Sequence, residues 1–261
     1  MLKRLVFILS LIFVLGLTAC DEPEKPKEEV KKEAGPKYGG IYRRAFPDPY
    51  ILLDPAQVKE SNSNEICRQL YDGLVEFSAS DTVVPCLAES WQISEDKLVY
   101  TFKLRKDVRF HRIVNNIATK NGGRLLSAED VLYSFKRLLA PKSNHENSFF
   151  RIIKGANDYY EGKAEDLAGI HVLASDTIQF ELEHPFSPFI SILCVSNAFI
   201  VPHEDADNLE NMPVGTGAFK WKGKIGDRYV LEANTEYFRG RPWLDGMEFV
   251  IIPKEEDRFN Q

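Results

Sequence analysis

Several residue patterns in the chain come close to catalytic motifs, and each of them lacks a part. Gly215-Thr-Gly217 begins like a dinucleotide-binding loop, but Lys220 stands where the third glycine belongs. Gly162-Lys163 and Gly223-Lys224 fail as phosphate loops, because other residues occupy the position of the first glycine. The chain has no Gly-x-Ser-x-Gly elbow to hold the nucleophile of an α/β-hydrolase. The sequence therefore predicts a protein that is not an enzyme.

The sequence also has no pattern that is typical of a metal site or a cofactor-binding site. The histidines show no metal-ligand spacing; they lie at positions 111, 145, 171, 184 and 203. Acidic residues are plentiful, but no two of them stand out as an acid–base couple. We therefore expect neither a metal site nor a cofactor.

The cysteines beyond the N-terminal region are Cys67, Cys86 and Cys194. An oxidising compartment would favour one disulfide and one leftover thiol, and Cys67 and Cys86 are the nearest two in sequence. Three reduced thiols in a dry core are an equally open alternative. Spacing alone does not decide between them.

The N-terminus has the pattern of a targeting segment. Lys3 and Arg4 precede an apolar run from Leu5 to Leu17, and Thr-Ala-Cys follows, ending at Cys20. A basic region, an apolar region and small residues before a cleavage point are typical of a secretory signal. An uncleaved anchor is the alternative, although the run is shorter than the ~20 residues that a spanning helix needs. Both interpretations place the rest of the chain outside the cytoplasm.

The next segment is strongly charged. Of the seventeen residues 21–37, eleven are charged and three are prolines. Such a segment cannot bury enough apolar surface to order itself. We therefore expect residues 20–37 to form a disordered, extended tether.

The remainder has the composition of a globular protein. The chain has 261 residues, of which 44% are hydrophobic and 28% charged, enough for one large or two modest domains. The formal net charge of −6 argues against nucleic acid as a partner, because phosphate binding relies on Lys and Arg.

The central element is an alternating stretch. Leu98, Tyr100, Phe102 and Leu104 alternate with Val, Thr, Lys and Arg, which predicts a half-buried strand. Trp91 lies just upstream, where its ring can cover one end of such a sheet. The residues 177–182 alternate in the same way and predict a second strand.

Two helices are predicted from apolar spacing. Ser61-Asn-Ser-Asn64 offers caps for a helix whose apolar face is formed by Ile66, Leu70 and Leu74. Ser127-Ala-Glu-Asp130 is a capping signature before a second helix, which Pro141 stops. Between the elements, the polar residues 112–124 are expected to form a surface loop.

Several short motifs of the sequence, in the order in which the family has them, resemble those of the family 5 extracellular solute-binding proteins. This family contains the dipeptide, oligopeptide and nickel receptors of ABC importers. The motifs are Leu-Ala-Glu-Ser-Trp ending at Trp91, the stretch 98–111, Leu-Ser-Ala-Glu-Asp from Leu126, Pro-Val-Gly-Thr-Gly-Ala-Phe ending at Phe219, and Tyr-Phe-Arg-Gly ending at Gly240. The resemblance covers the chain from Tyr38 to about Pro253.

The resemblance implies an α/β fold of the periplasmic-binding-protein class, type II, as in peptide receptors. Residues 38–76 and 199–261 would form the core domain of the first lobe, and residues 77–198 an inserted α/β domain. Family members are much longer, and the second lobe that closes over the ligand would be missing. We therefore expect the chain to be a fragment or the product of a disrupted gene.

The resemblance also implies a ligand site. In peptide-binding relatives, the segment at this distance after Leu53-Asp-Pro55 lies along the bound peptide and pairs with its backbone. A capped, solvated turn is the alternative. The predicted ligand-binding residues are Lys59, Glu60, Ser61 and Asn62. Phe149 is a weaker candidate from the second domain, for which core packing is the favoured alternative.

The cysteine at the cleavage point resembles that of a bacterial lipoprotein signal. Residues 1–19 would then be removed and Cys20 acylated, which anchors the protein to the cell membrane on its periplasmic or extracellular side. Asp21 resembles the inner-membrane retention signal of Gram-negative lipoproteins, although the type of host stays open.

The function implied is that of a monomeric substrate-binding lipoprotein that captures oligopeptides or dipeptides for the permease subunits of an ABC importer. Only the N-terminal half of such a receptor would be present. A sensor or chaperone lipoprotein of the same fold, a non-binding gene remnant and a secreted hydrolase are the alternatives. Nickel, haem or sugar ligands also stay open.

Overall fold

The computed structural model describes residues 37–141 and 148–259. The signal segment, Cys20 and nearly all of the tether lie outside the described residues. The helices are α1 (Ser61–Leu70), α2 (Ala128–Leu138), α3 (Ala156–Tyr160), α4 (Phe189–Ile192) and α5 (Glu255–Phe259). The strands are β1 (Ile41–Phe46), β2 (Val75–Phe77), β3 (Val83–Pro85), β4 (Ala88–Ile93), β5 (Val99–Leu104), β6 (Ile113–Val114), β7 (Ile117–Ala118), β8 (Ile170–Ala174), β9 (Thr177–Glu181), β10 (Phe219–Ile225), β11 (Arg228–Ala233) and β12 (Gly246–Ile251).

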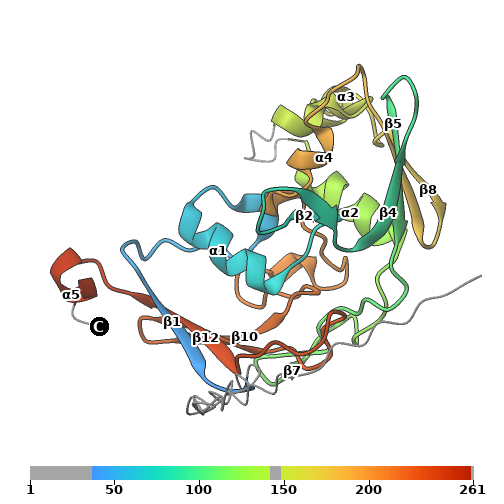
Figure 1. The fold of residues 1–261 in the computed structure, drawn as a ribbon. Helices are drawn as coiled ribbons and strands as arrows, with labels where there is room; N and C mark the ends of the chain where they lie inside the picture. The colour runs from blue at the N-terminus through green and yellow to red at the C-terminus, as the bar shows by residue number, and fades with distance from the viewer. Residues whose placement is uncertain (1–36, 142–147, 260–261) are drawn as a thin grey trace, which may run out of the picture. The chain divides into compact units, whose positions relative to one another are not determined.

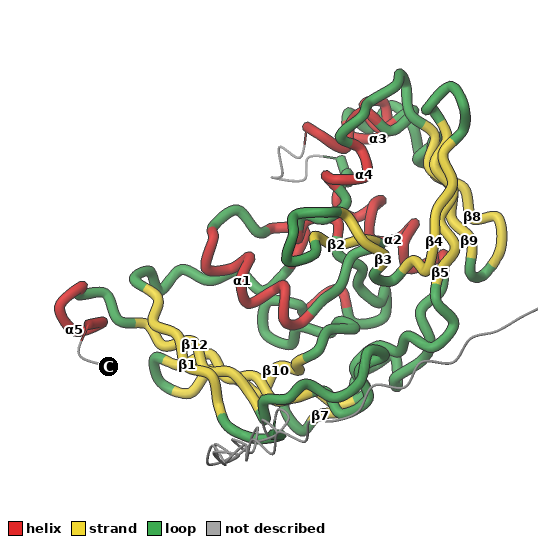
Figure 2. Tube along the Cα trace, in the orientation of Figure 1, coloured by secondary structure: helices red, strands yellow, loops and turns green. Residues whose placement is uncertain are grey.

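The strands form two four-stranded sheets and two small hairpins. The first sheet has the order β1-β12-β11-β10, in which β1 is parallel to β12 and the other neighbours are antiparallel. The first strand of the chain is therefore paired with a strand some two hundred residues later, as Figure 1 shows. The second sheet is antiparallel throughout and has the order β4-β5-β9-β8; Figure 2 shows its strands side by side. Strands β2 and β3, and strands β6 and β7, form the hairpins.

The predicted central strand is confirmed. Strand β5 lies between β4 and β9, and its alternate residues Tyr100, Phe102 and Leu104 are buried. The Phe102 ring meets that of Phe180 edge to face, with centroids 5.7 Å apart, and Trp91 packs against Phe102 from β4 at 6.4 Å. Aromatic pairs at these distances add to the burial of the sheet's inner face.

Helix α2 covers this inner face and begins where the capping signature predicts. The Asp130 carboxylate accepts hydrogen bonds from the backbone N–H and the hydroxyl of Ser127, both at 2.9 Å. These bonds satisfy groups that the first turn of a helix leaves without partners. Phe135 on the buried side of the helix contacts the rings of Phe180 and Phe150.

The prediction for the first helix needs two corrections. Helix α1 ends at Leu70, because Tyr71 is extended with φ −132° and ψ 158°, so Leu74 lies beyond the helix rather than on its face. The N-cap is Glu60, whose side chain makes no capping bond, and Ser63 instead accepts a hydrogen bond from the Leu52 N–H at 2.8 Å. Ser63 therefore holds the preceding loop rather than the helix end.

The stretch 112–124 is largely exposed, as its polarity predicts, but it is not an irregular loop throughout. It contains the hairpin β6–β7, and Val114 on this hairpin is completely buried in the core. The Asp205 carboxylate holds the stretch by accepting from the N–H groups of Lys120 and Asn121, at 2.8 and 3.0 Å, and from the Asn121 amide at 2.7 Å. Thr119 and Asn121 are thus buried polar residues, whereas Arg112, Asn115 and Asn116 are exposed.

The buried apolar residues form two clusters. One includes the inner face of the second sheet with α2, and the other includes the first sheet with α1. The clusters do not follow the predicted boundaries residue by residue: Ala56 and Leu74 pack in the first cluster and Val114 in the second. The domain boundaries themselves stay a prediction.

The three described cysteines are buried free thiols. The structure therefore agrees with the alternative of three reduced thiols in the core. Among the described residues, no helix has the length and apolar character needed to cross a membrane.

Candidate ligand-binding site

The segment that leads into α1 is fixed by charged groups from distant parts of the chain. The buried Asp54 carboxylate caps a 3₁₀ turn at Pro55–Gln57 by accepting from the Ala56 N–H at 3.1 Å. The Arg137 guanidinium of α2 pairs with both oxygens of this carboxylate. The Glu210 carboxylate accepts from the N–H groups of Leu53 and Asp54, at 3.0 and 3.2 Å.

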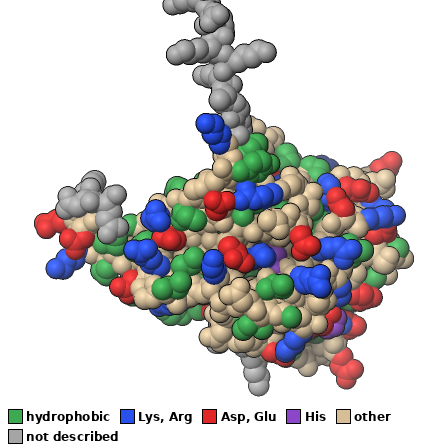
Figure 3. Space-filling view, turned by 90° about the horizontal axis from the view of Figure 1, so that it is seen from below, with side chains coloured by type: hydrophobic (Ala, Val, Ile, Leu, Met, Phe, Trp, Pro, Cys, Tyr) green, Lys and Arg blue, Asp and Glu red, His purple; other side chains and the backbone are tan. Residues whose placement is uncertain are grey.

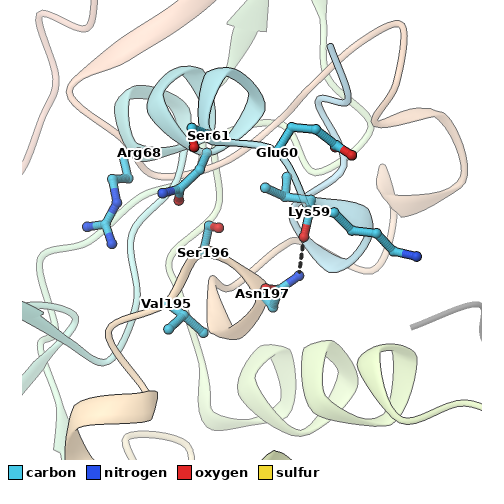
Figure 4. A pocket seen from close by; sticks show the side chains of 9 residues that line it. Lys59, Glu60, Ser61, Arg68, Val195, Ser196 and Asn197 are labelled. Atoms are coloured by element: carbon cyan, nitrogen blue, oxygen red, sulfur yellow. Dashed lines mark hydrogen bonds between the residues drawn. The ribbon is translucent and has the colours of Figure 1, made fainter. Parts of the chain in front are cut away.

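A single amide side chain holds the next part of the segment. Asn197, in the 3₁₀ turn Ser196–Ala198, donates from its Nδ2 to the carbonyl oxygens of Pro55 and Val58, both at 3.0 Å. The backbone around Lys59 therefore has a defined position before α1 begins. Figure 4 shows Asn197 below this segment.

A cavity of about 220 Å³ lies between this segment, the start of α1 and the turn that carries Asn197. We call it the α1 cavity. It is lined by Val58, Lys59, Glu60, Ser61, Asn64, Arg68, Val195, Ser196 and Asn197. The lining combines both signs of charge with hydroxyl and amide groups.

Two oxygens of the lining residues have unsatisfied hydrogen-bonding capacity. Glu60 Oε2 and Asn64 Oδ1 are buried and have no hydrogen-bond partner among the residues that the structure describes. A buried acceptor without a donor is costly, but both oxygens are closed off from solvent in this conformation, so a ligand could bond to them only after a local movement.

Arg68 is held at the other side of the cavity. Its Nη2 donates to the Cys194 carbonyl oxygen at 3.2 Å, and its guanidinium lies 6.0 Å from the centroid of the Phe199 ring. In Figure 4 the Arg68 side chain and those of Lys59 and Glu60 extend to opposite sides of the helix start. Such an arrangement suits non-covalent recognition of a polar ligand by hydrogen bonds and charge.

The structure places three of the four predicted segment residues at this cavity. Lys59, Glu60 and Ser61 line it, whereas Asn62 stands next to them in α1 but is not part of the lining. The four residues stay predicted ligand contacts.

Phe149 lies at a different place. Its side chain is 64% exposed, so the expectation of core packing is wrong for Phe149, and the neighbouring Phe150 takes the core position. A second cavity of about 430 Å³ is lined by Phe149, Arg151, Ile152, Asn157, Glu183, His184 and Phe186. The structure thus does not bring Phe149 together with Lys59–Asn62.

Sequence reasoning missed Asn64, Arg68 and the residues 195–197 of the α1 cavity. Asn64 and Arg68 lie four residues apart on α1, so the helical spacing could have indicated that they share a face. Residues 195–197 carried no comparable signal, because they reach the cavity only through the tertiary fold.

One further cluster has the residue types of a metal site. Asp130, His203 and Glu204 bring a ligand atom each within 4.8 Å of one another. The Arg124 guanidinium occupies this space, with bonds of 2.6 Å to Asp130 and to Glu204. The hydrogen bonds and negative charge of these carboxylates raise the pKa of Arg124. The guanidinium of Arg124 therefore already pairs with the carboxylates that a metal ion would need.

A buried carboxyl group also lies outside the cavity. Asp72 accepts from the Thr216 hydroxyl at 2.7 Å and from the Tyr237 hydroxyl at 3.2 Å. Burial raises the pKa of Asp72, and the two hydrogen bonds oppose this rise. Asp72 thereby joins the end of α1 to two loops of the first-sheet region, which is a structural role.

The family model described as bacterial extracellular solute-binding proteins, family 5 Middle, matches residues 82–261. The chain belongs to this family. Its fold is the mixed α/β fold of the type II periplasmic peptide-binding proteins.

Relatives of known name are similar over most of the chain. The heme-binding protein A of Haemophilus influenzae is 31% identical over 94% of this chain and 46% of its own length. The dipeptide-binding protein of Escherichia coli is 34% identical over 73% of this chain and 36% of its own length. The chain thus spans less than half the length of these relatives.

A solved structure is also similar to this chain, and the chain again covers less than half of its length. The ABC transporter-associated periplasmic binding protein DppA from Helicobacter pylori, in complex with the peptide STSA, is 30% identical. It aligns with a TM-score of 0.71 over 86% of this chain and 45% of its own.

Proposed function

We propose that this chain is the substrate-binding component of an ABC importer and that it captures dipeptides or oligopeptides outside the cytoplasm. The observation that carries the proposal is the α1 cavity, in which a backbone segment held by Asn197 borders charged, hydroxyl and amide side chains. Peptides of any sequence offer backbone N–H and C=O groups, so a site of this kind accepts ligands with variable side chains. Membership of a solute-binding family supports a binding role without catalysis.

The relatives support peptide as the ligand class. A dipeptide-binding protein and a structure with a bound peptide are both similar to this chain at 30% identity or more. A haem-binding relative is similar at the same level, so haem is the competing ligand for any binding assay. The ligand would be delivered to the permease subunits of the importer.

The attachment to the membrane forms part of the proposal. A lipid on Cys20 would hold the protein at the outer side of the cell membrane, and the charged tether would let it reach a permease. The protein would act as a monomer.

Photo-crosslinking tests the location of the site. A tripeptide with a benzophenone side chain is irradiated with the purified chain, and the linked residues are identified by mass spectrometry. We expect links within residues 58–64 and 195–197, which an excess of unlabelled tripeptide removes. Links confined to the surroundings of Phe149, or links that unlabelled peptide does not reduce, would argue against the α1 cavity.

A further inference from the structure

An exposed aromatic pair marks the place where the described part of the chain begins. The rings of Tyr38 and Trp243 are stacked with centroids 4.4 Å apart and an angle of 27° between their planes. Tyr38 is 61% and Trp243 48% exposed. Large aromatic side chains gain most of their free energy from burial, so an exposed stack is a candidate contact surface.

The pair is built into the fold rather than loosely attached. The Gly39 N–H donates to the Trp243 carbonyl oxygen at 2.8 Å, and the Asp245 N–H donates to the Gly40 carbonyl oxygen at 2.9 Å. The glycines have φ values of 130° and 88°, which other residues rarely adopt, so this tight turn depends on them. These bonds fix the two rings at the end of the first sheet where β1 begins.

A cation completes the surface. The Arg241 guanidinium lies 5.0 Å from the centroid of the Tyr38 ring and pairs with the Asp245 carboxylate. Lys37, which precedes Tyr38 in the sequence, is exposed as well. Tyrosine and tryptophan next to arginine and lysine are the residues that settle at a lipid–water boundary, with rings among the headgroups and cations near phosphates.

The length of the tether indicates that lipid is within reach. Seventeen residues separate Cys20 from Tyr38. Fully extended they span at most about 60 Å, which sets the greatest distance between an anchored Cys20 and Tyr38. A tether of this length keeps the described part of the chain near the bilayer, so even a weak contact would be populated.

We propose that Tyr38, Trp243 and Arg241 form a membrane-contact surface, with which the anchored protein rests on the headgroups of the lipid bilayer. The inference rests on the proposed anchor at Cys20 but not on peptide binding. In this orientation the opposite end of the first sheet lies on the side away from the bilayer. At that end Ile225 pairs with Arg228, and Arg228 pairs with Val250.

Tryptophan fluorescence tests this surface directly. The chain has three tryptophans, and among them Trp243 is exposed, Trp221 is 4% exposed and Trp91 is partly buried. The chain from Cys20 onward is coupled through Cys20 to a maleimide lipid; the thiols of Cys67, Cys86 and Cys194 are buried and react slowly. The vesicles contain phosphatidylethanolamine and phosphatidylglycerol, with or without bromine on the acyl chains.

We expect bromine to quench the emission of the anchored wild-type chain, and Trp243→Phe to abolish this quenching. A double variant with Trp243→Phe and Ile225→Trp is the matched control, because Ile225 is 63% exposed at the far end of the same sheet. Its emission should not respond to bromine. Equal emission of the wild type in both kinds of vesicle would overturn the proposal, as would equal quenching of Trp243→Phe. Peptide binding is measured without vesicles, so the two proposals fail separately.

Discussion

His111 is a buried residue whose imidazole ring contacts the backbone of the fold rather than a ligand. Its Nε2 contacts the Gly217 carbonyl oxygen at 3.0 Å, and its Nδ1 accepts from the Gly215 N–H at 3.4 Å. Accepting at Nδ1 requires the neutral ring with its proton on Nε2. Burial lowers the pKa of His111 to about 4, while the bond to Gly217 opposes the shift.

This pKa predicts a loss of stability in acid. The folded-state pKa lies below the unfolded value of about 6.5, so the unfolded state binds the proton first as the pH falls. The stabilisation is fully present above pH 6.5 and is lost as the pH falls toward 4, by about 3 kcal/mol in total. The free energy of unfolding, measured with urea at pH 7 and at pH 5, shows this loss. In His111→Asn the difference between the two pH values should shrink; an unchanged difference would assign it to other groups.

Asn197 connects the candidate site to the fold through its side chain. Asn197→Ala removes both bonds to the carbonyl oxygens of Pro55 and Val58, and we expect it to cost about 1–2 kcal/mol of folding free energy. It should also weaken peptide binding, because the segment before α1 is released. Asn211→Ala is the control, since Asn211 bonds only to the exposed Asn208 side chain. Equal loss of peptide affinity in both variants would contradict a positioning role for Asn197.

At the scale of elements, a buried ion pair connects α2 to the segment before α1. Asp54 is 2% exposed, and the Arg137 guanidinium donates to both of its carboxylate oxygens. Arg137→Ala would leave this carboxylate buried without a cation, which costs about 3–5 kcal/mol. Lys136→Ala, one residue earlier, breaks only a solvated pair with Asp166 and should cost less than about 1 kcal/mol. Similar losses in thermal unfolding for the two variants would show that the Asp54 pair is not buried in solution.

The hairpin β6–β7 depends on one carboxylate in the same way. Asp205→Ala removes the acceptor of three hydrogen bonds from Lys120 and Asn121. We expect the amides of residues 113–121 to exchange with solvent faster, while those of α2 keep their protection. Asp207→Ala, an exposed neighbour, is the control. Uniform protection across the hairpin in Asp205→Ala would refute the anchoring role.

Features that depend on neighbouring residues could be predicted from the sequence, whereas features that depend on distant residues could not. Strand β5 and helix α2 were predicted because periodicity and capping are local properties, visible within about a dozen residues. The position of Leu74 was predicted wrongly, since the extended Tyr71 ends the helix although the four-residue spacing continues. Local patterns do not show where tertiary packing ends an element.

The candidate site shows the same limit. Lys59, Glu60 and Ser61 were found through a family resemblance, but the groups that hold them come from far along the chain. Arg137 lies 83 residues from Asp54, and Asn197 lies 139 residues from Val58. Local patterns in a single sequence do not reveal such pairs, because their contact results from the folding of the whole chain. The same holds for residues 112–124, whose buried partner Asp205 is 84 residues from Asn121.

At the scale of the whole molecule, the distribution of charge fits a small polar ligand better than a polyanion. The formal net charge is −6, and the face in Figure 3 carries Lys and Arg interspersed with Asp and Glu. That face offers no broad basic surface of the kind that neutralises phosphates. A local cavity with both signs of charge is the feature that recognition can use.

The most direct test of peptide capture is a titration of the purified chain with a tripeptide, followed by the backbone amide signals in two-dimensional NMR. We expect saturable shifts at Lys59–Ser61 and Ser196–Asn197, with a dissociation constant of about the millimolar range for a cavity of this size. The amides of β8, far from the cavity in the fold, serve as the internal reference. A well-folded spectrum in which no amide shifts at any peptide concentration would contradict peptide binding by this chain.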